Sequence, residues 1–236
     1  MEDRTNNTVF VSVPHSACVK GADHRTCDTR AEQAARSLVD QYPQGRKKML
    51  LNVELTDVQG YRTVVSQPYV NHSIVRSGPE NDLNRETGSH HSWSVLLVEC
   101  LRWMSIECKR KGIRGMVVDT HSFYSGGFGE ENDDARVIIL VKNTKLGYAL
   151  SLKDHLVLAI DKAKEENNGP LEDWPKSKRC VKIVAASREN YIREKAVSFG
   201  LNSVLLEFRE DKKVLSDVAL DLLCREIGKW LVYYIQ

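Results

Sequence analysis

The sequence lacks several features that mark particular protein classes. No stretch is apolar for the ~18 residues or more of a membrane span, and the polar N-terminus, residues 1–7, lacks the apolar segment of a signal peptide. The formal net charge of +2 is too small to indicate a nucleic-acid partner. The six cysteines include no Cys-x-x-Cys pair, which argues against a zinc ribbon. We therefore expect a cytoplasmic protein with free thiols and with neither a membrane nor a nucleic acid as partner.

Strand-like and helix-like segments alternate along the chain. We expect strands at 8–13, 49–55, 116–119, 137–141, 181–185 and 203–208, and helices at 28–42, 92–111, 152–166, 189–199 and 215–234. A stretch from 56 to 92 has little periodicity, apart from a possible strand near 61–65. The alternation predicts a single domain over 1–236 with an α/β fold: a three-layer sandwich around a mixed, largely parallel sheet.

Two histidines follow strand-like runs, and each is followed by serine. His15 ends Val-Phe-Val-Ser-Val-Pro-His, and His121 ends Gly-Met-Val-Val-Asp-Thr-His. Neighbouring strands of one sheet bring their carboxyl ends together, and ligands of open α/β sheets bind at that edge. Histidine is the commonest metal ligand, so the pair predicts a metal site.

The third ligand of such a site is expected to be a carboxylate, because two histidines and one acid form a common catalytic zinc set. Asp28 is the first choice, since it opens the helix after the first strand and should lie near the edge where His15 emerges. Four other residues with ligand chemistry compete with it: Cys18, Asp23, His24 and Glu32.

Further polar residues suit the handling of a substrate. Arg85 offers a planar fork for a carboxylate, and Asn84 adds amide donors. Arg76 and Arg136 are weaker candidates for the same kind of work, and Arg76 is our candidate for a catalytic cation. Glu207 lies in an apolar strand, where an acid is costly unless it is paired or used. Glu207 either faces solvent by alternation or points into the site as a general base.

Taken in order, these short motifs resemble the N-formylglutamate amidohydrolase family. They are Val-Pro-His-Ser at 13–16, the acidic helix start at Asp28, Asp-Leu-Asn-Arg at 82–85, Asp-Thr-His-Ser at 119–122 and Leu-Glu-Phe-Arg at 206–209. The resemblance implies a fold similar to the zinc carboxypeptidases, within the phosphorylase/hydrolase-like architecture.

The same resemblance implies a role for each matched residue. His15, Asp28 and His121 would hold zinc, and Asn84 with Arg85 would grip a substrate carboxylate. Glu207 would activate water for attack on an amide carbonyl, with zinc and a nearby cation stabilising the tetrahedral intermediate. The implied substrate is an N-acyl amino acid or a small peptide-like amide with a free carboxylate.

Two departures from the family pattern motivate other hypotheses. Cys18 stands where the carboxypeptidase relatives place an acidic ligand, and the helix start reads Asp-Thr-Arg-Ala at 28–31 instead of a longer acidic pattern. A catalytically silent relative that acts as a binding module is therefore the alternative. A third class is a thiol-dependent enzyme in which Cys18 or Cys27 works with His15 or His24.

Overall fold

A computed structural model of the chain describes residues 8–12, 29–41, 48–52, 73–74, 91–141, 146–166, 171, 173–186 and 190–234. The possible strand near 61–65 lies outside these residues. No helix in the described ranges is long and apolar enough to cross a membrane.

The described strands form one seven-stranded sheet with the order β3-β2-β1-β4-β7-β5-β6. They are β1 (Thr8–Ser12), β2 (Lys48–Asn52), β3 (Ser73–Ile74), β4 (Gly115–Phe123), β5 (Val137–Val141), β6 (Val181–Ala185) and β7 (Asn202–Arg209). Five strand pairings are parallel, and β5 runs antiparallel to β7. The sheet is therefore mixed and largely parallel, as the sequence predicts.

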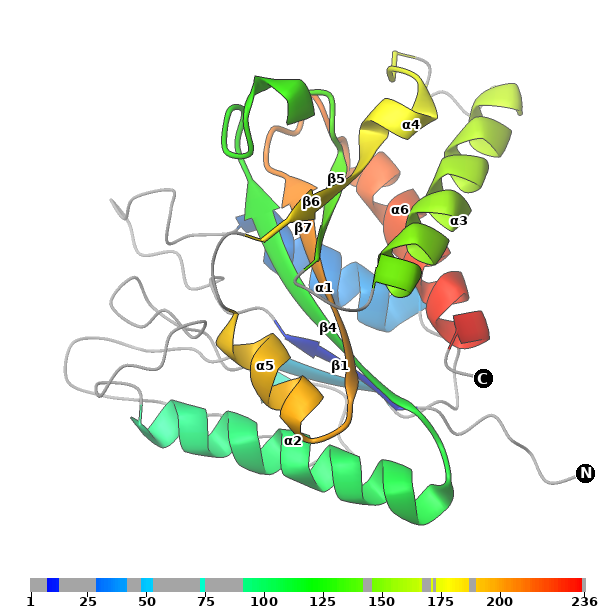
Figure 1. The fold of residues 1–236 in the computed structure, drawn as a ribbon. Helices are drawn as coiled ribbons and strands as arrows, with labels where there is room; N and C mark the ends of the chain where they lie inside the picture. The colour runs from blue at the N-terminus through cyan, green and yellow to red at the C-terminus, as the bar shows by residue number, and fades with distance from the viewer. Residues whose placement is uncertain are drawn as a thin grey trace, which may run out of the picture.

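Helices cover both faces of this sheet, which gives three layers (Figure 1). The described helices are α1 (Thr29–Gln41), α2 (His91–Lys111), α3 (Leu146–Glu165), α4 (Ser177–Cys180), α5 (Tyr191–Ser198) and α6 (Asp217–Tyr234). Figure 1 shows α2 and α5 on one side of the sheet and α1, α3 and α6 on the other. The three-layer α/β prediction is confirmed at this level.

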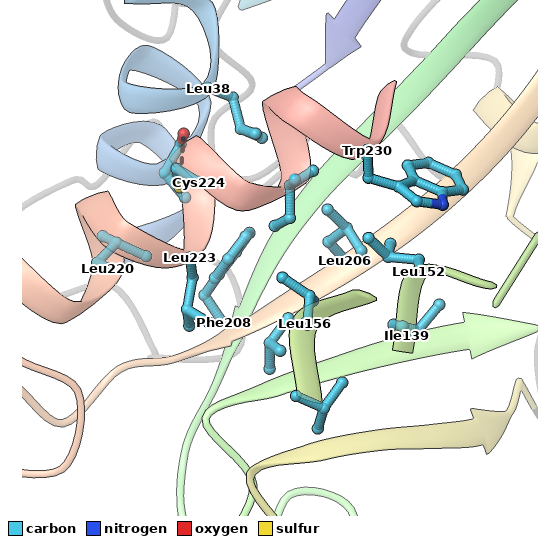
Figure 2. Close-up of a cluster of buried hydrophobic side chains, with 14 of the residues drawn as sticks. Leu38, Ile139, Leu152, Leu156, Leu206, Phe208, Leu220, Leu223, Cys224 and Trp230 are labelled. Carbon is cyan, nitrogen blue, oxygen red and sulfur yellow. Dashed lines mark hydrogen bonds between the residues drawn. The ribbon is translucent and has the colours of Figure 1, made fainter. Parts of the chain in front are cut away.

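The larger hydrophobic cluster lies between α1, α3, α6 and the sheet (Figure 2). Phe208 of β7 lies beside Leu223 of α6. Leu206 of β7 and Ile139 of β5, which are paired in the sheet, lie nearer Leu152 of α3, and all five side chains are fully buried. Apolar residues at helical spacing on α1 complete the cluster, namely Ala31, Ala34, Ala35, Leu38 and Val39. Apolar periodicity in the sequence therefore identified this core face correctly.

The opposite face carries a smaller cluster beneath α2 and α5. Leu101, Met104 and Cys108 of α2 pack there with Phe10 of β1 and Val117 of β4. The helix α2 ends at Lys111, before Gly112, whose φ of 63° suits a residue without a Cβ. Its predicted end is thus confirmed.

Four elements differ clearly from the sequence predictions. The strand β4 extends to Phe123 instead of ending at Asp119, and α3 begins at Leu146 instead of Leu152. The additional turns of α3 are stabilised by tertiary contacts, since Ala149 is buried and the rings of Tyr148 and Tyr234 lie 4.4 Å apart. The short elements β3 and α4 were not predicted. Both are too short to have a recognisable period.

Candidate functional site

A buried carboxylate organises the polar residues of the α5 face. Asp119 of β4 is fully buried and accepts hydrogen bonds from Ser12 Oγ at 2.5 Å and Asn190 Nδ2 at 2.8 Å. His121 Nε2 lies 3.1 Å from its Oδ2. Burial alone would raise the pKa of Asp119, but His121, Ser12 and Asn190 together hold that pKa below its ordinary value. Asp119 is therefore a carboxylate that fixes the position of an imidazole.

Each donor to Asp119 is itself held by the fold. Ser12 is the last residue of β1 and stands opposite Asp119 in the parallel β1–β4 register. Asn190 caps α5, because its Oδ1 accepts the backbone N–H of Arg193 at 2.8 Å while its amide nitrogen reaches Asp119. The carboxylate thus ties together β1, β4 and the start of α5.

Glu207 stands beside His121 in the sheet. The parallel β4–β7 register pairs the two residues directly, and residues paired in this way project from the same face. Both side chains are largely buried, with 6% of His121 and 9% of Glu207 exposed. An imidazole and a carboxylate therefore lie on neighbouring strands toward the carboxyl ends of β4 and β7.

Two expectations for these residues were wrong. His121 does not follow a strand but lies inside β4, because β4 continues to pair with β7 as far as Phe123 and Arg209. The alternative in which Glu207 faces solvent is also wrong. Alternation along β7 does separate the two faces, but helices cover both of them.

The first turn of α1 lies at the same edge of the sheet. Glu210, which follows β7, accepts hydrogen bonds from Ser122 Oγ at 2.6 Å and from the backbone N–H of Arg30 at 3.3 Å. The N–H groups of the first turn of a helix have no acceptor within the helix, and the Glu210 carboxylate supplies one. Its negative charge also complements the positive end of the helix dipole. The helix that Asp28 precedes in sequence thus begins beside the carboxyl ends of β4 and β7.

The geometry at His121 fits a zinc ligand. A metal-binding histidine usually donates its other ring N–H to a carboxylate, which fixes the tautomer and the ring orientation. With Nε2 directed at Asp119, Nδ1 is the nitrogen with ligand character. No group of three or more histidine, cysteine or acidic side chains placed to hold a metal occurs among the described residues. A metal held by His121 would therefore need ligands from outside the described residues.

Most of the predicted site residues fall in that remaining part. His15, Asp28, Arg76, Asn84 and Arg85 lie outside the described residues, as do the competing Cys18, Asp23, His24 and Cys27. Their roles stay predictions.

Two other candidates can be placed. Glu32 accepts hydrogen bonds from Arg36 Nε at 3.0 Å and Nη2 at 2.7 Å, so an ion pair along α1 accounts for its charge. Arg136 directly precedes β5 and is buried.

Sequence reasoning missed Asp119, Ser12 and Asn190. A signal for Asp119 was present, since an acid within Met-Val-Val-Asp-Thr-His is costly to bury without partners, and its spacing of two from His121 places both on one face of a strand. Ser12 and Asn190 carried no such signal, because their contact with Asp119 depends on strand order and helix placement.

The comparisons with known proteins give the chain no family. No protein-family model and no curated protein matches it. The chain is similar to the crystal structure of the gene product Atu2144 from Agrobacterium tumefaciens, with 16% identity and a TM-score of 0.49. That similarity covers 96% of this chain and 88% of the other.

Proposed function

We propose that this chain is a zinc-dependent amidohydrolase that cleaves an amide bond in an N-acyl amino acid or small peptide-like substrate with a free carboxylate. The observation that supports the proposal is His121, held by the buried Asp119 and placed beside Glu207 at the carboxyl edge of the sheet. The zinc-carboxypeptidase-like fold type belongs to the same proposal.

In this proposal the residues divide the chemistry between them. His121, with His15 and Asp28, holds the metal, and zinc supplies Lewis-acid polarisation and activation of water when bound. Glu207 takes a proton from the attacking water and returns it to the departing amine, so that one water and one amide give a carboxylic acid and an amine.

The remaining residues position the substrate and the metal ligand. Asn84 and Arg85 bind the substrate carboxylate, and Arg76 supplies the cation beside the reacting carbonyl. Asp119 does not touch the substrate; it keeps the His121 ring in the tautomer that zinc requires.

Metal analysis of the full chain is the first test. Protein purified without chelators is expected to hold, or take up on titration, one zinc per chain. His121→Asn should lower the zinc affinity strongly. His155→Gln is the matched control, because His155 lies on α3 and faces Glu226 at 3.5 Å. Equal zinc binding by the His121 variant and the wild type would refute the role of His121, and a chain that binds no zinc would refute the proposal.

Amine release from a panel of N-formyl and N-acetyl amino acids tests the reaction. Glu207→Gln should keep zinc and lose turnover by at least ~10²-fold, the lower range for a general base. Turnover that persists in this variant would exclude Glu207 as the base. Zinc binding without turnover on any acyl amino acid would favour the silent relative instead.

A chelator and a thiol reagent separate this reaction from thiol chemistry. Loss of turnover with a chelator, but not after mild alkylation, excludes a cysteine nucleophile. Burial raises the pKa of Cys180 to about 11 and also raises that of Cys100 and Cys224, so none of these three thiols is activated. Turnover that survives the chelator and fails after alkylation would overturn the zinc proposal.

A further inference from the structure

Two arginines lie opposite each other where β5 begins and β7 ends. The backbone N–H of Arg209 donates to the carbonyl of Arg136 at 3.0 Å, one step beyond the antiparallel pair Val137 and Phe208. Residues opposite each other in an antiparallel pair have Cβ atoms about 4.5–5.5 Å apart. Two cations in this arrangement repel each other unless an anion joins them.

Both guanidinium groups are buried, and each has at least one N–H donor without a hydrogen-bond acceptor among the described residues. Only 9% of Arg136 and 5% of Arg209 is exposed. Within the described structure, Arg136 Nε and Arg209 Nε and Nη1 have no hydrogen-bond partner. The carboxylate of Asp133 lies 3.7 Å from Arg209 Nη1, beyond hydrogen-bond distance. Buried donors without acceptors are rare in folded proteins, and a bound ion is one of the groups that can satisfy them.

Aromatic rings support both groups. The Cζ atom of Arg209 lies 5.5 Å from the ring centroid of Phe123, and that of Arg136 lies 5.5 Å from the ring centroid of Trp174. Contact with a ring occupies the flat face of a guanidinium, whereas its N–H groups point outward in the guanidinium plane. The rings thus restrain the arginines without using their donors.

Ion pairs to two neighbouring carboxylates surround the arginines. Asp134 is ion-paired with the more exposed Arg179, and Asp133 forms an ion pair with Arg209 at 3.7 Å. Burial lowers the pKa of Arg136, and the neighbouring Arg209 lowers it further. An added anion would relieve this repulsion.

We propose that Arg136 and Arg209 bind a single oxyanion group, a carboxylate or a phosphate, through their in-plane N–H groups. The fork geometry of a guanidinium matches both anions. Arg209 follows Glu207 by two residues on the same face of β7, so this anion site lies next to the region of His121. The inference does not depend on zinc or on hydrolysis.

Thermal unfolding of the full chain tests the site with inorganic phosphate and with acetate, each against sodium chloride at equal ionic strength. Saturable stabilisation by at least one anion is expected, about 5–10 °C at a concentration near 100 times Kd. Stabilisation by phosphate alone assigns a phosphate ligand, and by acetate alone a carboxylate ligand. No stabilisation beyond that of chloride would overturn the proposal.

Substitutions test whether the anion-dependent stabilisation arises at Arg136 and Arg209. Arg209→Gln should abolish the anion-dependent shift, and Arg136→Lys, which keeps the charge but loses the planar fork, should weaken Kd at least about tenfold. Arg225→Gln on the exposed surface of α6 is the control and should keep the full shift. An unchanged shift in Arg136→Lys would refute the assignment even if Arg209→Gln does not fold.

Discussion

Removal of the Asp119 carboxylate should be among the most destabilising single changes in the described part of the chain. Asp119→Ala takes the acceptor from Ser12 Oγ, Asn190 Nδ2 and His121 Nε2 in a region with no solvent exposure at Asp119. Hydrogen bonds to a charged group contribute about 1.5–3 kcal/mol each, and these three do not add independently. We expect a loss of about 3–5 kcal/mol, the range for breaking a buried pair.

The loss is large beside the stability of an ordinary domain, about 5–15 kcal/mol. Urea unfolding followed by tryptophan fluorescence, in the presence of a chelator, measures it without a contribution from metal. The slope of the free energy against urea should stay unchanged, because the native surface is the same. Asp154→Ala on the exposed side of α3 is the control and should fall within about 0.5 kcal/mol of the wild type.

A double-mutant cycle shows whether the contacts of Asp119 are the cause. Ser12→Ala alone should cost about 1–2 kcal/mol, and its coupling to Asp119→Ala should be about 1–3 kcal/mol because the two side chains share a 2.5 Å hydrogen bond. The reasoning would be refuted if the stability losses of the two single variants added up to that of the double variant within about 0.5 kcal/mol. It would also be refuted if Asp119→Ala lost less than about 1 kcal/mol, because a single hydrogen bond to a charged group contributes more than that.

Two further predictions concern stability. The hydrogen bond from Arg30 lowers the pKa of Asp217 to about 2. This pair therefore stabilises the fold above the unfolded pKa of about 4, and the stabilisation is lost as pH falls toward 2. In acid titrations, Asp217→Asn should remove at most about 1 kcal/mol of this pH-dependent stability, because Asp217 is half exposed. Gly115→Ala should cost about 1–3 kcal/mol in urea unfolding, because its new Cβ would lie 2.7 Å from Leu201 Cδ2, whereas Gly147→Ala, with open space around it, should not destabilise the fold.

The fold was predictable where the pattern was local. Strands β5 and β6 match their predicted ranges, and α1 has the predicted apolar face, because side-chain periodicity needs no knowledge of neighbours. The extended end of β4 was not predictable in this way. Residues 120–123 are polar or mixed in character and stay in the strand because β7 pairs with them.

In the candidate site, too, some residues could be predicted from the local sequence and others could not. His121 and Glu207 were identified from the sequence, because His121 follows a strand-like run and Glu207 is an acid within an apolar run. The partner that orients His121 was missed, because Asp119 acquires its role from Ser12, 107 residues away, and from Asn190, 71 residues away.

The sequence by itself determined the α/β alternation, the core-facing side chains and the two residues around which a hydrolytic site is proposed. Tertiary structure alone decided that His121 lies beside Glu207, that both are buried, and that Arg136 lies opposite Arg209. The physical reason is that hydrophobic periodicity acts over a few residues, whereas strand order and register join segments far apart in the chain. The antiparallel insertion of β5 beside β7 brings the two arginines together, and no local pattern encodes it.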